Sequence, residues 1–427
     1  MSILLCTGLI ACGGYKNPNT TNRSGLTFRA FISNPVNPSP TGGGFPALDI
    51  MDAKKDMLSP FEVSLSGTVA SSGMMVEAPK RDRTVVYSPT GSASSNTTLG
   101  IVDNATESTT STVTLPGPTE SMFVAGDSNT LFAAIPNAPI TAQSPGAVVQ
   151  VSLPSSAVTA TIPVAGAHFI IPSPSGNQIL VISDSAGTVT VLAPALISTG
   201  NALTPVAAAS GTFDKPVWAV FSADGSTAYV MNCGQECGGS AAGIVAVDMT
   251  QTPPVASAPV AIAAATTGLI NGGNLYVAGT PASGGADCQA NLCGLLTVFP
   301  GANLSAAPTQ FAITDGFHDR LVMAPNNQLF IGSRTCTNVI ASGNTPGRGC
   351  LSVLNTGGGT VYTAAQTGDV TGIQPILNRT VVYVCEGGAF SIYDTALDLG
   401  SQRQLKPQTK TEITIVGQAI DVKLVDF

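Results

Sequence analysis

Short apolar runs separated by polar turns follow one another along almost the whole chain. Residues 178–181 (Gln-Ile-Leu-Val) and 227–230 (Thr-Ala-Tyr-Val) are representative runs. Each run spans only about four to six residues and is rich in β-branched or aromatic residues, so the pattern predicts β-strands rather than helices. Turns rich in Ser, Gly, Asn and Asp, such as residues 175–177 and 224–226, separate the runs.

The strands recur with a period of about 50 residues, which indicates a repeat architecture. In each repeat one apolar run precedes a turn and a second follows it. A third run often opens with Gly, as at 187–192 and 243–248, and a Thr-rich fourth run such as 157–164 ends the unit. Four short strands per unit are typical of a β-propeller blade. The copies of the second run begin at Thr27, Thr84, Thr130, Gln178, Thr227, Asn274, Gln328 and Thr380.

The two ends of the chain complement each other. Residues 26–66 predict the second to fourth strands of a unit that lacks a first strand, and residues 419–425 predict a first strand with no unit after it. Joined, they would complete one blade and close the ring without an open sheet edge. We therefore expect an all-β, eight-bladed propeller of four-stranded blades, whereas a seven-bladed ring would require one irregular unit. The expected units are 26–66 with 418–427, 73–117, 118–165, 166–210, 216–262, 265–313, 317–366 and 370–416.

Composition agrees with stacked blades. Charged residues make up 10% of the chain, hydrophobic residues 44% and aromatic residues 5%, and the net charge is −8. Blades that stack face to face bury both sides of their strands, which leaves few positions for charges. This apolar composition excludes a disordered chain, and 17 scattered Lys and Arg residues exclude a basic nucleic-acid interface. No apolar run reaches the ~20 residues of a membrane-spanning helix.

The amino-acid sequence of the repeats resembles that of a known family. Residues 222–230 read Ser-x-Asp-Gly-Ser-x-Ala-Tyr-Val, and residues 243–248 read Gly-x-Val-x-Val-Asp. These strings resemble the repeats of YVTN/YncE-like β-propellers, and the resemblance extends over nearly the whole chain after residue 25. It implies the fold, but it does not imply a function, because such repeats occur in binding proteins and enzymes alike.

The N-terminus resembles that of a bacterial lipoprotein. Residues 1–11 are mostly apolar and small, and residues 9–13 read Leu-Ile-Ala-Cys-Gly, which is similar to a lipobox. The resemblance implies a signal peptide at 1–11 (with a start codon possible further upstream), lipidation of Cys12, a flexible tether at 12–25 and a single propeller domain at 26–427. We therefore expect a lipid-anchored, extracytoplasmic protein, at the periplasmic face or the cell surface. The alternative is a cytosolic N-terminal strand that carries an accidental Cys.

Six of the nine cysteines form pairs that are close in sequence, and each pair lies in a loop rich in Gly, Ser or Asn. Such pairs predict disulfides in an exported protein. Metal binding is the alternative, although no C-x-x-C motif occurs and neither His adjoins a pair. Cys385 lies within the apolar run 381–385 and is expected to be a buried, inert thiol. The predicted pairs are Cys233/Cys237, Cys288/Cys293 and Cys336/Cys350.

A candidate site lies on one face of the expected ring. Loops between second and third strands share that face with the blade-to-blade connections, and the three predicted disulfides and the long loop 34–45 all fall in such loops. Residues at the start of the inner strands would surround the channel mouth there, and the only Trp and both His of the chain have this register. They could bind a ligand or a metal or act as acid and base groups, or they could simply bond turn backbones between blades. The candidates are Glu120, His168, Trp218, His318, Gln374 and Asp421, with Asp319 and Arg320 nearby.

These observations predict a binding scaffold at the bacterial cell envelope. We expect a monomer that associates with the membrane through its lipid and binds an envelope protein or a glycan through its loop face. We expect no cofactor, no metal and no nucleic-acid partner. The alternative is a hydrolase resembling propeller lactonases, with Glu120, His168, His318 and Arg320 at the channel mouth. The sequence leaves open whether the protein is an enzyme.

Overall fold

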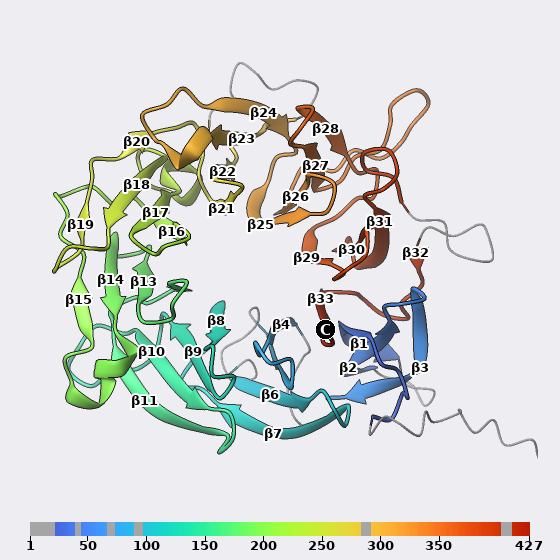
Figure 1. Cartoon of the computed structure of the whole chain (residues 1–427), viewed down its shortest axis with the longest axis horizontal. Coiled ribbons are helices and arrows are strands. Elements are labelled where there is room, and N and C mark those ends of the chain that lie inside the picture. The colour runs from blue at the N-terminus through green and yellow to red at the C-terminus, as the bar shows by residue number, and fades with distance from the viewer. Residues whose placement is uncertain (1–21, 39–43, 66–72, 89–96, 283–291, 403–411) are drawn as a thin grey trace, which may run out of the picture.

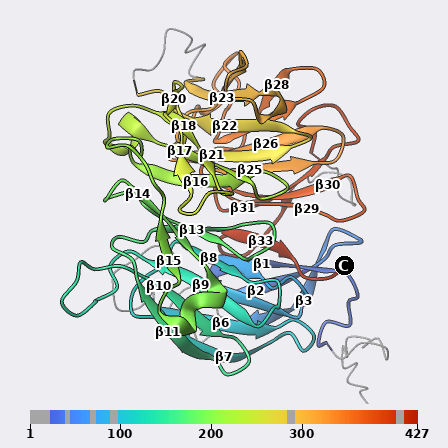
Figure 2. The same cartoon turned by 60° about the vertical axis from the view of Figure 1, so that its left-hand side comes forward.

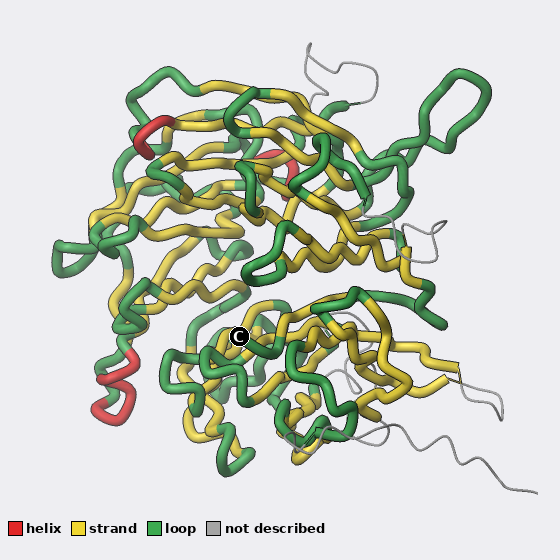
Figure 3. The backbone as a smooth tube through the Cα atoms, turned by 45° about the vertical axis from the view of Figure 1, so that its right-hand side comes forward, coloured by secondary structure: helices red, strands yellow, loops and turns green. Residues whose placement is uncertain are grey.

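The computed structural model describes residues 22–38, 44–65, 73–88, 97–282, 292–402 and 412–427. Eight antiparallel sheets stand around a common axis and form an eight-bladed β-propeller (Figure 1). Strands account for most of the ordered elements, and the only helices in these ranges are short 3₁₀ turns (Figure 3). The expected fold class, with eight rather than seven blades, is confirmed.

Blades are numbered here in chain order, and each begins with its innermost strand. Blades 1 and 2 contain β33 (Asp421–Leu424), β1 (Arg29–Pro38), β2 (Gly44–Asp52) and β3 (Met57–Ser64), then β4 (Met74–Glu77), β5 (Arg83–Tyr87), β6 (Thr98–Asp103) and β7 (Ser108–Thr114). Blades 3 and 4 contain β8 (Ser121–Val124), β9 (Thr130–Ile135), β10 (Ala147–Ser152) and β11 (Ala157–Pro163), then β12 (Phe169–Pro172), β13 (Ile179–Ser183), β14 (Thr188–Leu192) and β15 (Leu203–Pro205).

The second half of the ring follows the same plan. Blades 5 and 6 contain β16 (Pro216–Phe221), β17 (Thr227–Asn232), β18 (Gly243–Asp248), β19 (Val255–Ala256) and β20 (Val260–Ala261), then β21 (Thr267–Asn271), β22 (Asn274–Gly279), β23 (Gly294–Phe299) and β24 (Thr309–Ile313). Blades 7 and 8 contain β25 (Phe317–Ala324), β26 (Gln328–Arg334), β27 (Leu351–Asn355) and β28 (Thr360–Thr363), then β29 (Val370–Pro375), β30 (Val381–Glu386), β31 (Ala389–Asp394) and β32 (Glu412–Ile413). The 3₁₀ turns are η1 (Pro194–Thr199), η2 (Gly234–Cys237) and η3 (Pro300–Ala302).

The last strand closes the ring, as the sequence predicts. Strand β33 pairs with β1 from Ala30↔Leu424 to Ser33↔Asp421, so the end of the chain supplies the inner strand of blade 1. The inner strands then contact one another in sequence around the axis, from β33 through β4, β8, β12, β16, β21 and β25 to β29 and back to β33.

The hydrophobic core lies between the blades. Eight clusters of buried residues each join two adjacent blades. In β9, Leu131 and Ala133 pack toward blade 2, whereas Phe132 and Ala134 pack toward blade 4. Because successive side chains of a strand point to opposite faces, a strand between two neighbouring sheets must be apolar at every position. This explains continuous apolar runs rather than alternating ones, and Figure 2 shows the sheets stacked face to face.

Candidate functional site at the start of the inner strands

The sequence-predicted site residues belong to what we call the upper face, where the inner strands begin and the second strands end. Glu120 and His168 immediately precede β8 and β12, and Asp184 immediately follows β13. An inner strand and its antiparallel neighbour place the start of one beside the end of the other, so these three side chains gather at the same edge.

His168 lies between two carboxylates. Its Nδ1 atom is 3.1 Å from Oδ1 of Asp184, and its Nε2 atom is 3.5 Å from Oε2 of Glu120. The imidazole also stacks on the ring of Phe169, with 4.0 Å between the ring centroids. The His168 side chain is 22% exposed and the Glu120 side chain 45% exposed, so this cluster faces solvent at one end. We call Glu120, His168 and Asp184 the acidic cluster.

Electrostatics keep His168 protonated at neutral pH. Burial lowers the pKa of His168, but hydrogen bonds and charge attraction from Asp184 and Glu120 outweigh burial and raise this pKa to about 9. The hydrogen bond from His168 in turn holds the pKa of Glu120 below its usual value, although burial opposes this shift. Each ring nitrogen therefore carries a proton that points toward a carboxylate. The protonated imidazole has no free lone pair with which to act as a general base.

A second charged group comes from blade 7. Oδ2 of Asp319 lies 3.3 Å from Nη1 of Arg320 and 2.8 Å from Nε of Arg334. The latter contact is an ion pair rather than an aligned hydrogen bond. The Arg334 guanidinium lies over the ring of Phe317, 5.6 Å from its centroid. We call Asp319, Arg320 and Arg334 the basic cluster, because two guanidinium groups share one carboxylate.

His318 is not part of either cluster. Its side chain is fully buried, and Nε2 bonds to the carbonyl oxygen of Thr314 at 2.9 Å. A side chain at Gly294 would collide with the His318 ring, so the strand from blade 6 approaches it closely. Burial lowers the pKa of His318 to about 4, although the Thr314 carbonyl opposes this shift. The neutral ring therefore packs at the junction of blades 6 and 7, which is a structural role rather than a role in ligand binding.

Two other candidates connect neighbouring blades. Nε1 of Trp218 on β16 donates to the carbonyl oxygen of Gly268 on β21 at 3.2 Å. Asp421 on β33 is fully buried, accepts a bond from the Met75 backbone N–H at 2.8 Å, and lies 3.0 Å from Nζ of Lys423. These contacts hold adjacent inner strands together around the axis.

Gln374 does not lie at the start of its inner strand, where the alignment of the repeats placed it. It is the fifth residue of the six-residue strand β29, and its side-chain amide donates to the Pro375 carbonyl at 2.8 Å. The start of β29 on the upper face is instead formed by Val370 and Thr371. Blades 5, 7 and 8 share a register shift near the start of the inner strand, so Val370 and Thr371, rather than Gln374, occupy the position next to this shift in blade 8.

Sequence reasoning missed Asp184 and Arg334. Both lie at the end of a second strand, Asp184 just after β13 and Arg334 as the last residue of β26. The sequence-based candidates came only from the starts of the inner strands. The ends of the second strands reach the same face, so polar residues there were the signal that could have revealed them.

Disulfide-bonded loops also lie on the upper face. Disulfides join Cys233 to Cys237 in blade 5 and Cys336 to Cys350 in blade 7, as expected. Cys385 on β30 is a free, buried thiol, which also agrees with the expectation.

The third predicted pair, Cys288/Cys293, lies only partly within the described residues. Cys293 immediately precedes β23 and is disulfide-bonded rather than a free thiol. Its predicted partner Cys288 lies outside the described residues, so the pairing of these two cysteines stays a prediction. Cys12 and the expected signal peptide also lie outside the described residues.

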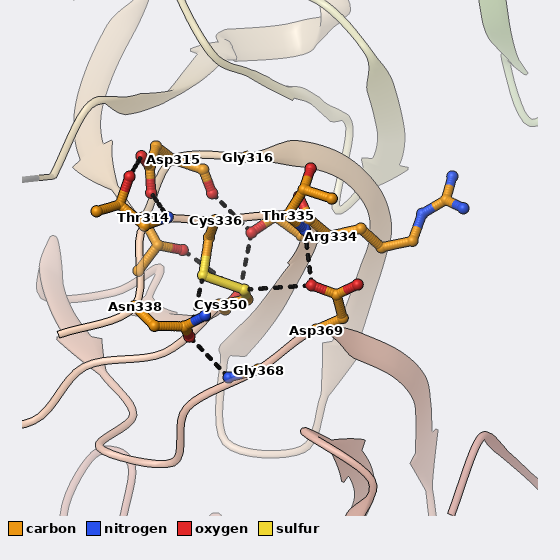
Figure 4. Close-up of a disulfide and its surroundings, with 12 residues drawn as sticks. Thr314, Asp315, Gly316, Arg334, Thr335, Cys336, Asn338, Cys350, Gly368 and Asp369 are labelled. Carbon is orange, nitrogen blue, oxygen red and sulfur yellow. Dashed lines mark hydrogen bonds between the residues drawn. A yellow bond between two sulfur atoms is a disulfide. The ribbon is translucent and has the colours of Figure 1, made fainter. Parts of the chain in front are cut away.

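Hydrogen bonds attach the Cys336–Cys350 loop to its surroundings (Figure 4). Asp315 accepts bonds from the backbone N–H and the hydroxyl of Thr337, at 2.8 and 2.6 Å. Asp369 accepts a bond from the Thr335 N–H at 2.7 Å, and Asn338 accepts one from the Gly368 N–H at 2.7 Å. The two blade-to-blade connections on either side of blade 7 therefore hold the base of its loop.

A cavity of about 670 Å³ lies elsewhere, beside the outer half of blade 4. Small and apolar residues line it, including Val189, Val206 and Phe213, and none of the charged residues described above does so. Among the described residues, no group of three or more His, Cys, Asp or Glu side chains is arranged to hold a metal ion. Within the same ranges, no helix has the length and apolarity needed to cross a membrane.

Comparison with solved structures identifies the fold. The dihydro-heme d1 dehydrogenase NirN is 11% identical, with a TM-score of 0.62 over 94% of this chain and 75% of that chain. Hydrazine synthase from Kuenenia stuttgartiensis is 14% identical, with a TM-score of 0.55 over 77% of this chain and 96% of that chain. A periplasmic gluconolactonase from Pseudomonas aeruginosa is 12% identical over 93% of this chain and 98% of that chain, but its TM-score is only 0.47.

No protein-family model and no curated protein sequence matches the chain. Identities this low show shared architecture and carry no information about activity, because one fold hosts many activities. The likeness to NirN and to the hydrazine synthase chain therefore shows the fold alone.

Proposed function

We propose that the protein is a binding scaffold at the bacterial cell envelope, held there by a lipid on Cys12, and that it binds a partner protein through its upper face. Disulfides persist in compartments outside the cytoplasm, so the two described disulfides support an extracytoplasmic location. The observation that carries the proposed binding role is the hairpin between Cys336 and Cys350, whose base is fixed although its tip is exposed.

Hydrogen bonds within the hairpin stabilise it, in addition to the bonds from neighbouring segments. Backbone bonds of 2.8 and 2.7 Å join Val339 and Arg348, and bonds of 3.1 and 2.9 Å join Ser342 and Thr345. The buried Arg348 side chain donates to the Thr337 carbonyl at 3.2 Å. In Figure 1 the hairpin extends outward beyond β28. The loop therefore has a defined shape although it projects from the ring.

The tip of the hairpin suits a protein partner. Ile340 is 80% exposed, and residues 340–346 carry no charge. A loop this long is uncommon unless it has a function, and a preorganised loop loses less entropy when it binds. An exposed aliphatic side chain on such a loop can insert into an apolar pocket of a partner. A membrane surface fits less well, because the tip has no Lys, Arg, Trp or Tyr.

Site-specific photo-cross-linking in living cells tests the partner. A photoreactive residue in place of Ile340 should give a discrete adduct, and Ile340→Asp should abolish capture of the same protein by the purified scaffold. Leu377 is a matched control, because it is 42% exposed in the turn between β29 and β30, on the opposite face. Equal adducts from both positions, or capture that survives Ile340→Asp, would contradict the proposal.

Metabolic labelling with palmitate tests the anchor separately. The protein should incorporate the label and should accumulate as an unprocessed precursor in globomycin. Cys12→Ser should stay unlabelled and should be insensitive to globomycin. An unlabelled wild-type protein would refute the lipid anchor and would leave the upper-face proposal intact.

The hydrolase alternative has less support. Of the four residues that the resemblance to lactonases suggested, Glu120 and His168 meet, but His318 is buried between blades and Arg320 belongs to the basic cluster. The partly exposed His168 is protonated and the neutral His318 is buried, so neither histidine offers an accessible general base.

A further inference from the structure

Blade 4 has an incomplete outer strand. In blades 2, 3 and 6 the fourth strand pairs with the third from the first residue of the third strand onward, as Ala147 pairs with Pro163 in blade 3. In blade 4 the fourth strand β15 ends at Pro205, which lies opposite Thr190, whereas β14 begins at Thr188. The upper end of β14 therefore extends beyond its outer neighbour.

The segment that follows β15 joins blade 5 instead. After one further bond to blade 4, from the Val206 N–H to the Val189 carbonyl at 3.0 Å, the chain turns away. The Ala207 N–H donates to the Pro254 carbonyl, and the Ala207 carbonyl accepts from the Ala256 N–H, both at 2.8 Å. These bonds place the segment beside β19, at the outer edge of blade 5.

The uncovered end of β14 has backbone groups to spare. Odd-numbered residues here direct their backbone groups outward, since the Val189 carbonyl accepts from Val206 and the Ala193 N–H donates to the Ala202 carbonyl at 2.8 Å. Within the described part of the chain, the outward N–H of Val189 has no backbone partner, and neither do the N–H and carbonyl of Gly187. An unpaired strand edge is a template for another extended segment.

The cavity of about 670 Å³ lies at this edge. Residues 186–190 form one wall, residues 203–213 a second, and residues 163–165 at the end of blade 3 a third. Its volume falls within the range of roughly 300–1,000 Å³ that is typical of ligand pockets. None of the residues that line it is charged, and residues 207–211 are exposed, so the cavity opens to solvent.

We propose that this cavity binds a short, uncharged peptide in extended conformation, which runs beside β14 and takes the place of the missing end of β15. Peptide carbonyls accept bonds from the N–H groups of Val189 and Gly187, and a peptide N–H donates to the Gly187 carbonyl. Small apolar side chains of the peptide pack against Val164, Val206 and Phe213, which line the cavity.

Two observations favour a peptide over other ligands. Protein backbone fills the corresponding position in blades 2, 3 and 6, and strand addition to an exposed edge uses the same hydrogen bonds. A charged segment is disfavoured, because the cavity wall offers no opposite charge to a group that leaves water. This site lies in blade 4 and stands whether or not the Cys336–Cys350 hairpin of blade 7 binds a partner.

Fluorescence anisotropy with labelled, capped peptides and the purified protein tests the site. The sequences of β7 (residues 108–114) and β24 (residues 309–313) serve as probes, because both are uncharged and already pair with a third strand. At least one should bind saturably. The same peptide with N-methyl groups on alternate backbone nitrogens should bind at least about tenfold more weakly, because it has lost backbone donors. Hydrogen–deuterium exchange should show slower exchange at residues 187–189 when the peptide is bound.

Variants that fill the cavity separate this site from binding elsewhere. Ala209 and Ala165 line the cavity and are exposed, so Ala209→Trp and Ala165→Trp should each weaken peptide binding about tenfold or more. Ala307→Trp is the matched control, because Ala307 is also exposed but lies between η3 and β24 in blade 6, and it should leave binding unchanged. If Ala209→Trp fails to fold, Ala165→Trp decides the matter.

Three results would overturn the proposal. The first is that neither peptide binds at millimolar concentration. The second is that the N-methylated peptide binds as tightly as its parent, which would mean that no strand pairing occurs. The third is that binding survives in a folded Ala165→Trp protein, or that protection from exchange appears only outside blade 4, which would place the peptide elsewhere.

Discussion

The two histidines show how strongly the immediate surroundings control one side-chain type. His168 has two carboxylates beside it and some contact with solvent, so its charged form is stabilised. His318 has a backbone carbonyl and close packing instead, so its neutral form is stabilised. The same repeat register therefore produces opposite shifts in pKa, and opposite dependences of stability on pH.

His168 should stabilise the fold at low rather than high pH. Its pKa of about 9 lies above the value of about 6.5 expected in the unfolded chain, so its contribution is complete below about pH 6.5 and is lost as the pH rises through about 9. An NMR titration of the imidazole should give the raised pKa in the wild type and a lower one in Asp184→Asn. An unchanged pKa in that variant would show that Asp184 does not hold the proton.

His318 should make the protein sensitive to acid. Its pKa of about 4 lies below the unfolded value of about 6.5, so protonation favours the unfolded chain, and stability is lost as the pH falls from about 6.5 toward 4. Urea unfolding at several pH values should show a smaller loss over this range in His318→Gln than in the wild type. An equal loss in both proteins would mean that other groups cause it.

At the scale of single elements, the disulfide-bonded loops are the least regular parts of the repeats. The strands repeat because every blade meets the same neighbours, but loops on the upper face are free to differ. The Cys336–Cys350 bond closes a ring with a sequence separation of 14, and the Cys233–Cys237 bond one of only 4.

Removal of each disulfide should destabilise the protein according to the size of its ring. Replacement of Cys336 and Cys350 by Ser should lower the free energy of unfolding by about 3 kcal/mol, and the same change at Cys233 and Cys237 by about 2 kcal/mol, because the larger ring restricts the unfolded chain more. Urea unfolding under non-reducing conditions measures both. A larger loss from the smaller ring would indicate that native contacts, rather than chain entropy, dominate.

The whole molecule depends on the closure of its ring. The Arg29 side chain, on β1, lies 2.9 Å from Oε1 of Glu107 in blade 2 and 2.7 Å from Oδ1 of Asp426 beyond β33. Glu107 is fully buried and Arg29 nearly so. One guanidinium group thus joins the last strand to the first two blades.

Loss of Arg29 should therefore be far more costly than loss of a surface charge. Arg29→Met leaves Glu107 buried without this partner, which should destabilise the protein by about 3–5 kcal/mol. Lys55→Met removes an exposed partner of Asp52 and should cost less than about 1 kcal/mol. Thermal unfolding of both variants measures the difference. Similar melting temperatures would contradict the assigned role of Arg29 in closure.

Much of the fold could be predicted because it repeats. The period of about 50 residues, the continuous apolar runs and the complementary chain ends predicted eight blades and the pairing of β33 with β1. The close spacing of Cys233 with Cys237 and of Cys336 with Cys350 likewise predicted both described disulfides. These features depend on local hydrophobicity and chain distance, which a single sequence contains.

The candidate site depended on the tertiary structure. Glu120 and His168 were predicted together, but Asp184, which holds the other ring nitrogen of His168, follows a different strand and was not predicted. Whether a histidine is partly exposed like His168 or buried like His318 depends on what packs over it. Gln374 lies near the end of β29 rather than at its start on the upper face. Burial and charge partners arise only when distant segments meet, so repeat patterns indicate where a blade begins but not what its side chains touch.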